Sequence, residues 1–264
     1  MATNQEARGK FTWYDLMTTD IESATKFYTA LIGWGLEPWT GSGEMPYTMW
    51  KGPKGPLGGV MPLPDDAKKM GAPPNWIAYV FVPDLDATCA KVTELGGQVV
   101  VPPTEIPNVG SFAILQDPQG AVFAGLSSPE DMSGPDEPPQ VGQVSWHELM
   151  TNDYEAAFAF YSTLFGWEKG EAMDMGPEMG GMYQMFGRKG APLGGMFNRP
   201  AQMPAPPMWI YYIRVDDVEA SIEKAKSLGA CLVNGPEEVP GGDKVAQLTD
   251  PQGALFALHS IQQG

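Results

Sequence analysis

The second half of this chain repeats the first half. FTWYDLMTTD (11–20) matches VSWHELMTND (144–153) at an offset of 133 residues, and KFYTALIGW (26–34) matches AFYSTLFGW (159–167). DPQGAVFA (117–124) matches DPQGALFA (250–257) at the same offset. A repeat this long is the first feature to settle, because both copies must adopt the same fold and each motif is seen twice.

Further matches extend the repeat along the chain. GPLGG (55–59) matches APLGG (191–195) at an offset of 136, because the second half carries an insertion before this motif, and WIAYVFVPDLDA (76–87) matches WIYYIRVDDVEA (209–220). Residues 127–140, SSPEDMSGPDEPPQ, are rich in proline, serine and acidic residues and have no apolar periodicity. We therefore predict domain 1 over residues 1–126, a linker over 127–140 and domain 2 over 141–264.

The sequence pattern of each half predicts a strand, a helix and several strands, and this order occurs twice within each half. Residues 11–18 alternate as a strand, Asp20 is placed to cap a helix whose apolar residues recur at helical spacing, and Gly33 ends that helix. Short strands are predicted near 45–51 and 56–62. The pattern then restarts with a strand over 76–82, a helix beginning near Asp84, and strands near 98–102, 110–116 and 121–127. The whole chain is thus predicted as α+β, with four βαβββ motifs.

Composition excludes several classes of function. The 264 residues include 43% hydrophobic residues, enough for a substantial core, and the net charge of −16 opposes binding to nucleic acid or anionic membranes. No apolar run could span a membrane and the N-terminus has no secretory pattern, so we expect a cytoplasmic protein. Its two cysteines are expected to be reduced. Its oligomeric state is expected to be monomer or homodimer.

The paired βαβββ motifs, the Asp-capped FY helix and the DPQG turn before the last strand resemble the vicinal oxygen chelate superfamily. That superfamily includes glyoxalase I, bleomycin-resistance proteins and extradiol dioxygenases. The resemblance covers nearly the whole chain outside the linker. It implies two tandem glyoxalase-like domains, each an incomplete barrel of strands around a cavity.

The resemblance also implies where a metal would bind. The family's ligand positions lie seven residues before each helix-capping aspartate and seven after the aspartate of the DPQG turn. In this chain they are Trp13, Ile77 and Ala124 in the first half and Trp146, Ile210 and Ala257 in the second. None of these side chains ligates a divalent metal. We therefore predict that the protein has no metal site and no cofactor.

Strand alternation predicts which side chains face the two cavities. His147 is predicted to face the helix side, because its neighbours Trp146 and Glu148 face the cavity. His259 is predicted to lie either near the mouth of cavity two or at a solvated strand end. The predicted ligand-binding residues are Trp13, Asp15, Met17, Tyr79 and Phe81 in cavity one, and Trp146, Glu148, Met150, Tyr212, Arg214 and His259 in cavity two.

The two predicted cavities differ in polar groups. Arg214 in cavity two stands where cavity one has Phe81, so Arg214 could pair with Glu148 or bind a polar ligand. Asp15 lacks such a partner and could act as a general base. A filled core, with both carboxylates satisfied by neighbouring tyrosine, tryptophan or arginine donors, is the alternative. The methionines of MDMGPEMGGMYQM (173–185) fit a packing or flap role better than a Cu(I) site.

Three functions remain open from the sequence. The leading hypothesis is a metal-independent small-molecule-binding protein that sequesters a hydrophobic or aromatic compound. The first alternative is a lyase or isomerase of glyoxalase type, with Asp15 or Glu148 as acid or base. The second is a metal-dependent lyase or dioxygenase whose ligands differ from the family positions. Nucleic acid and membrane are not expected partners.

Overall fold

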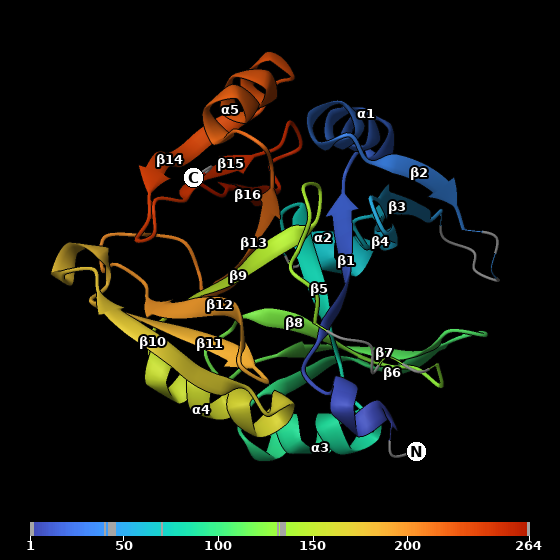
Figure 1. Ribbon diagram of the computed structural model, residues 1–264. Coiled ribbons are helices and arrows are strands. Elements are labelled where there is room, and N and C mark those ends of the chain that lie inside the picture. Colours follow the sequence, from blue (N-terminus) through green and yellow to red (C-terminus); the bar gives the residue numbers. More distant parts are fainter. Residues whose placement is uncertain are drawn as a thin grey trace. The chain divides into compact units, whose positions relative to one another are not determined.

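The computed structural model describes residues 3–39, 41, 46–69, 71–130, 132 and 136–262, and it shows four βαβββ motifs in chain order (Figure 1). The first half contains β1 (Phe11–Thr18), α1 (Ile21–Ile32), β2 (Gly35–Pro38), β3 (Thr48–Gly52), β4 (Gly55–Pro62), β5 (Asn75–Phe81), α3 (Leu85–Glu94), β6 (Gln98–Ile106), β7 (Gly110–Gln116) and β8 (Val122–Ser127). The second half contains β9 (Val144–Thr151), α4 (Tyr154–Phe165), β10 (Glu168–Asp174), β11 (Met182–Arg188), β12 (Ala191–Asn198), β13 (Met208–Arg214), α5 (Val218–Ser227), β14 (Cys231–Glu238), β15 (Lys244–Thr249) and β16 (Leu255–Ser260). The short helices η1 (Thr3–Ala7), α2 (Asp65–Lys69) and η2 (Pro177–Met179) were not predicted.

The helix ends follow the sequence signals. The carboxylate of Asp20 accepts a hydrogen bond from the backbone N–H of Ser23, 3.0 Å away, and α1 ends at Gly33, whose φ is +86°. The equivalent helix α4 has the same caps, Asp153 and Gly166. The predicted helix bounds are therefore confirmed. No helix among the described residues is long and apolar enough to cross a membrane.

Strand β2 was missed by the sequence analysis. All four of its residues, Gly35–Pro38, are exposed, and it forms one edge of its sheet. Because an exposed edge strand buries neither face, it shows no apolar alternation from which it could be predicted. The strand predicted over 45–51 begins at Thr48; residue 45 lies outside the described residues.

Each half of the chain forms one open eight-stranded sheet. The strand order is β2-β3-β4-β1-β5-β8-β7-β6 in the first half and β10-β11-β12-β9-β13-β16-β15-β14 in the second. In both halves the first strand of a βαβββ motif runs parallel to the last strand of the same motif. The predicted α+β class, with two tandem glyoxalase-like sheets that remain open and do not close into barrels, is confirmed.

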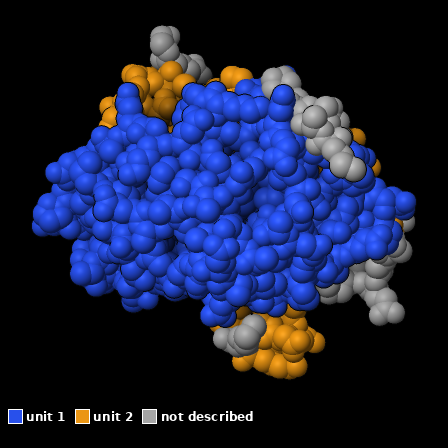
Figure 2. Space-filling model, turned by 90° about the horizontal axis from the view of Figure 1, so that it is seen from below, with its two compact units in different colours: residues 1–12, 78–137, 147–209 blue, residues 13–77, 138–146, 210–264 orange. Residues whose placement is uncertain are grey.

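The chain also divides into two compact units, and each unit takes one βαβββ motif from each half (Figure 2). Unit 1 comprises residues 1–12, 78–137 and 147–209, and unit 2 comprises residues 13–77, 138–146 and 210–264. The predicted boundaries at 126/127 and 140/141 follow the sequence repeat, and they stay predictions.

In unit 2, α1 and α5 lie side by side (Figure 1). Phe27 and Tyr28 of α1 pack edge-on against Phe256 of β16, with ring centroids 5.8 and 5.5 Å apart. Each of these aromatic side chains is at most 3% exposed. The core of this unit is therefore built jointly by the first and the last βαβββ motif of the chain.

A buried tyrosine–aspartate contact explains two of the repeated motifs. In unit 2 the hydroxyl of Tyr28 donates to Asp250 of the DPQG turn at 3.1 Å, and Trp76 Nε1 donates to that hydroxyl at 2.9 Å. The other oxygen of Asp250 accepts backbone N–H groups of its own turn, as expected for such a turn. Burial raises the pKa of the Asp250 carboxyl.

Unit 1 repeats this arrangement. Tyr161 donates to Asp117 at 3.0 Å and accepts from Trp209 Nε1 at 3.1 Å. Burial likewise raises the pKa of Asp117. The FY helix of one half thus bonds the DPQG turn of the other half, inside one unit.

Candidate functional site

Strand β1 presents alternate side chains to opposite faces of its sheet. Leu16 belongs to the core of unit 2, and Tyr14 packs against Tyr211 with ring centroids 5.8 Å apart. Asp15 and Met17 therefore point to the other face, away from that core. They pair in register with Gly59 and Met61 of the neighbouring parallel strand β4.

Asp15 is the centre of a small polar cluster in unit 2. Tyr47 donates to Asp15 Oδ1 at 2.7 Å, and Trp13 Nε1 lies 2.9 Å from the same oxygen and 2.6 Å from the Tyr47 oxygen. Burial, and then the Asp15 charge, raise the pKa of Tyr47. The phenol therefore stays protonated and acts as a donor to the carboxylate.

The glycines of the PLGG motif make room for this cluster. A Cβ on Gly59 would lie 2.1 Å from Cζ of Tyr47, so the tyrosine ring can cover β4 only where there is no side chain. A Cβ on Gly58 would lie 1.9 Å from the carbonyl oxygen of Tyr14 on β1. The first glycine allows two strands to approach closely, and the second leaves room for the tyrosine ring, so the motif serves backbone geometry.

Unit 1 contains the same arrangement in the second half of the chain. Tyr183 donates to Glu148 Oε2 at 3.1 Å, and a Cβ on Gly195 would lie 2.0 Å from the Tyr183 ring. Glu148 pairs in register with Gly195, and Met150 pairs with Phe197. A carboxylate, a tyrosine and a motif glycine therefore recur at matching positions in both sheets.

The two arrangements differ in exposure. Asp15 and Glu148 are both buried, at 5% and 9% exposed. Around Asp15 the apolar side chains of Trp13, Met17 and Met61 remain partly exposed. Met150 is only 3% exposed. The equivalents of Trp13 and Met61 in the second half, Trp146 and Phe197, are also partly exposed, so the face around Asp15 offers more apolar surface at Met17 alone. We call this face, made by Trp13, Asp15, Met17, Tyr47 and Met61, the Asp15 platform.

Tyr47 and Tyr183 were not among the predicted site residues. Each precedes the second glycine of its PLGG motif by twelve positions, and the two tyrosines are related by the same offset of 136 that relates the motifs. Aligning the repeats with that offset would have identified them. Their role could not be read from strand alternation, because each is placed by its contact with the neighbouring strand.

His147 lies in the aromatic core of unit 1. Its ring stacks on Phe11 with centroids 3.6 Å apart, and its Nδ1 lies 2.8 Å from the carbonyl oxygen of Leu193. Phe11 in turn packs on Trp167 and Trp209. Burial lowers the pKa of His147 to about 4, so the ring is neutral at pH 7.

Two other predicted site residues of the first half, Tyr79 and Phe81, are both buried. Tyr79 is 7% exposed and packs edge-on against Phe112, and Phe81 is completely buried. Phe81 therefore presents no surface to a ligand in this structure. Trp146 of the second half is partly exposed.

Tyr212 and Arg214 lie on β13 in unit 2. The hydroxyl of Tyr212 accepts a hydrogen bond from Gln247 at 2.9 Å. The guanidinium of Arg214 donates to the carbonyl oxygen of Pro139, in the predicted linker, at 2.6 Å. The proposed ionic role of Arg214 at Glu148 stays a prediction.

His259 has two polar partners in unit 2. Its Nδ1 lies 2.8 Å from Ser145 Oγ, and its Nε2 lies 3.1 Å from Asp243 Oδ2. Its side chain is 14% exposed and that of Asp243 is 31% exposed. Neither Ser145 nor Asp243 was predicted as a site residue.

The residues at the family's metal positions do not fit a metal. Indole, aliphatic and methyl side chains occupy all six positions, and the described part of the chain contains no group of three or more His, Cys, Asp or Glu side chains placed to hold an ion. Of the two free cysteines, Cys89 is buried and Cys231 is exposed.

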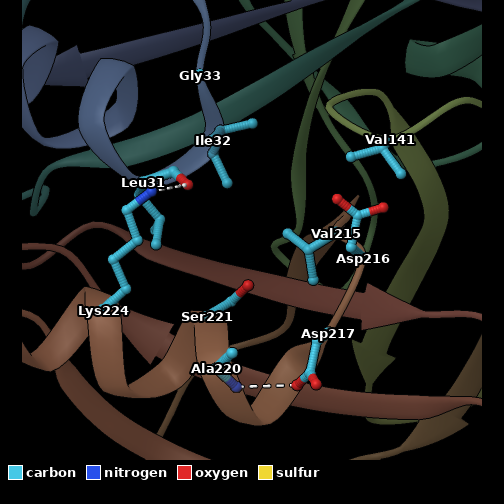
Figure 3. Close-up of a pocket in the computed structure, with 10 residues that line it drawn as sticks. All are labelled: Leu31, Ile32, Gly33, Val141, Val215, Asp216, Asp217, Ala220, Ser221 and Lys224. Carbon is cyan, nitrogen blue, oxygen red and sulfur yellow. Dashed lines mark hydrogen bonds between the residues drawn. The ribbon is translucent and has the colours of Figure 1, made fainter.

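A pocket of about 310 Å³ lies elsewhere in unit 2, between the end of α1 and the start of α5 (Figure 3). Lys224 crosses it to reach the carbonyl oxygen of Leu31 at 3.4 Å, and Asp217, which lines it, caps α5. None of the predicted site residues lines this pocket. It is an open recess between two helices, separate from the Asp15 platform.

Comparison with known proteins gives a consistent family. The model of the Glyoxalase/Bleomycin resistance protein/Dioxygenase superfamily matches residues 10–124 and 141–258. A protein of Mycobacterium tuberculosis (strain CDC 1551 / Oshkosh) named "Putative glyoxylase CFP32" is 35% identical over 254 residues, covering 95% of this chain and 94% of the relative. "Anthracycline biosynthesis protein DnrV" of Streptomyces peucetius is 28% identical over 273 residues, covering 98% and 95%.

Solved structures share the fold at low identity. The 2,3-dioxygenase LapB of Pseudomonas sp. KL28 has a TM-score of 0.66 at 11% identity, covering 97% of this chain and 94% of that one. The Mn(II)-bound glyoxalase of Novosphingobium aromaticivorans has a TM-score of 0.62 at 15% identity, covering 97% and 83%.

Proposed function

The chain belongs to the glyoxalase/bleomycin resistance protein/dioxygenase superfamily, and from this premise we propose that it is a metal-independent protein that binds a hydrophobic or aromatic small molecule. The six family ligand positions carry Trp, Ile and Ala, which supports metal independence. The Asp15 platform is the proposed binding surface.

The observation that carries this proposal is the composition of the platform. Trp13, Met17 and Met61 are apolar, partly exposed and on one face, and the Asp15–Tyr47 pair supplies polar atoms beside them. Indole and thioether groups make favourable contacts with flat aromatic rings. Apolar walls with a few fixed polar groups are typical of small-molecule sites. The ligand we expect is a planar aromatic compound bearing hydroxyl or carbonyl groups.

A glyoxalase-type lyase or isomerase is the second candidate, because the name of one relative includes glyoxylase. In that case Asp15 or Glu148 would serve as the acid or base. Both carboxylates already accept a tyrosine hydroxyl, so a substrate proton would have to compete with that hydrogen bond. This arrangement favours binding over proton transfer.

The first experiment measures binding of an anthracycline, chosen because another relative is named for anthracycline biosynthesis. Doxorubicin is titrated into the protein after dialysis against EDTA, and its fluorescence is followed. We expect saturable binding that is unchanged by EDTA, and less than 0.1 equivalent of Zn, Fe, Mn or Ni by elemental analysis. Trp13→Ala should weaken binding by roughly two- to twelvefold, since aromatic contacts of this kind contribute about 0.5–1.5 kcal/mol.

The matched control is Trp146→Ala, the equivalent change in the second half. Equal losses of doxorubicin affinity in both variants would show that the Asp15 platform is not the binding site. A stoichiometric metal retained after dialysis would contradict metal independence. Turnover of the methylglyoxal–glutathione hemithioacetal, abolished by Asp15→Asn or Glu148→Gln, would instead establish the second candidate.

A further inference from the structure

Ser145, His259 and Asp243 form a connected line of side chains in unit 2, apart from the Asp15 platform. Ser145 lies on β9, His259 lies on β16, and Asp243 directly precedes β15. Ser145 Oγ is 2.8 Å from His259 Nδ1, and His259 Nε2 is 3.1 Å from Asp243 Oδ2. The second oxygen of Asp243 accepts the backbone N–H of Gln262 at 2.9 Å, which fixes the carboxylate.

The direction of these hydrogen bonds follows from the groups themselves. An ionised Asp243 can only accept, so His259 carries its hydrogen on Nε2 and donates it to the carboxylate. In the neutral ring, Nδ1 is then an acceptor. The single hydrogen of the Ser145 hydroxyl can be donated either to this nitrogen at 2.8 Å or to the carbonyl oxygen of Tyr212 at 3.2 Å, and the contact to Nδ1 is the shorter one. A serine hydroxyl directed at a histidine whose tautomer is held by a carboxylate is the arrangement that activates serine nucleophiles. The two ring nitrogens are exchanged here relative to the usual arrangement.

The first half of the chain shows that the fold does not need this arrangement. Thr12 stands in the place of Ser145, and its hydroxyl donates to the carbonyl oxygen of Tyr79 at 3.2 Å, the counterpart of the Tyr212 carbonyl that competes with His259 for the Ser145 hydrogen. Leu126 occupies the register position of His259. Gly110 occupies the position of Asp243, counting back from the DPQG turn. The histidine and the aspartate are therefore additions to the second half alone.

We propose that Ser145 is an activated nucleophile toward small esters and related acyl donors, with His259 as its general base and Asp243 as a positioning residue. The serine oxygen forms a bond to the acyl carbon while its proton moves to His259 Nδ1. The bond from the acyl carbon to the leaving oxygen breaks, and that oxygen takes the proton. Water then attacks the acyl-serine by the same route, which releases the acid and restores the hydroxyl.

The test uses the full chain and p-nitrophenyl acetate. We expect release of p-nitrophenolate with transient acetylation of Ser145, located by mass spectrometry of the digested protein. Ser145→Ala should abolish acetylation at this position, and His259→Leu, which installs the residue of the first half, should slow it about 100-fold or more. Thr12→Ala is the matched control and should leave the rate unchanged.

A second readout separates activation from a structural role. Nitrogen NMR of the histidine rings should show His259 protonated on Nε2 and bare on Nδ1 near neutral pH. Asp243→Asn should disturb both this tautomer and the acylation rate, and Asp243→Glu should restore them. Three results would overturn the proposal. They are acetylation confined to lysines, an acylation rate in the His259→Leu protein equal to that of the wild-type protein, and a His259 ring protonated on Nδ1.

Discussion

The buried histidine of unit 1 gives the sharpest prediction about stability. His147 is 5% exposed, stacks on Phe11 and is held neutral, with its pKa lowered to about 4 from an ordinary value of 6.5. Burial disfavours the charged ring, and this effect exceeds the stabilisation of the charged ring by the Leu193 carbonyl. The change we consider is His147→Phe, which keeps an aromatic ring beside Phe11 and removes the titrating group.

The size of the effect follows from the two pKa values. Between about pH 6.5 and about pH 4 the unfolded chain binds a proton on this histidine and the folded chain does not. Stability therefore falls as the pH drops through this window. Each pH unit between the two pKa values corresponds to about 1.36 kcal/mol. His147 therefore lowers the free energy of unfolding by about 2 kcal/mol at pH 5, and by about 3.4 kcal/mol well below pH 4.

The assay is urea unfolding of the wild-type protein and the His147→Phe variant at pH 7.5 and at pH 5. Loss of the hydrogen bond to Leu193 lowers the stability of the variant by a similar amount at both pH values, so it cancels when the two pH values are compared. His259 is present in both proteins. We expect the stability difference between the two proteins to shift by about 2 kcal/mol in favour of the variant at pH 5.

A stability difference that is the same at both pH values within about 0.5 kcal/mol would refute the reasoning. So would an NMR titration in which the His147 ring protonates near pH 6.5. His147→Gln offers a check, because it keeps a donor for Leu193 while removing the charge, and it should show the same dependence on pH.

Other predictions concern the repeated motifs. Tyr28→Phe should lower the free energy of unfolding by about 1.5–3 kcal/mol in urea, because it removes a buried hydrogen bond to Asp250. Gly59→Ala should displace Tyr47, whose ring would lie 2.1 Å from the new Cβ; calorimetry should show weaker doxorubicin binding, and Gly195→Ala should leave that binding unchanged. Cutting the chain between residues 133 and 134 should give two fragments that are poorly folded alone and regain circular dichroism when mixed.

Much of the fold could be predicted from the sequence because every signal occurs twice. Asp20 and Asp153 both mark helix starts, and both are confirmed as caps. The missed strand β2 carries no apolar pattern because it is exposed along its length. Local propensity and alternation identify elements that bury one face. An element that is exposed on both faces has no apolar pattern from which it could be predicted.

The candidate site was harder to predict, because its partners come from distant parts of the chain. Alternation placed Asp15 and Met17 on one face of β1, but nothing in alternation brings Tyr47 over Gly59. Alternation suggested that Arg214 could pair with Glu148 or bind a polar ligand, and this stays a prediction. It gave no sign that the backbone N–H of Arg214 would pair with Gln143 or that its guanidinium would donate to the Pro139 carbonyl. Such partners depend on how segments pack, which side-chain chemistry alone does not determine.

Four of the residues that are the same in both halves, two tryptophans and two tyrosines, join the halves. Trp34 Nε1 donates to the carbonyl oxygen of Gly142 at 2.6 Å, and Trp167 Nε1 donates to that of Gly9 at 2.8 Å. Each tryptophan therefore bonds the segment leading into the first strand of the other half, just as each FY tyrosine bonds the other half's DPQG turn. Duplicated halves that complete one another's cores in this way cannot easily lose these residues. His259 with Asp243 is a difference between the halves, and this pair does not carry the joining role.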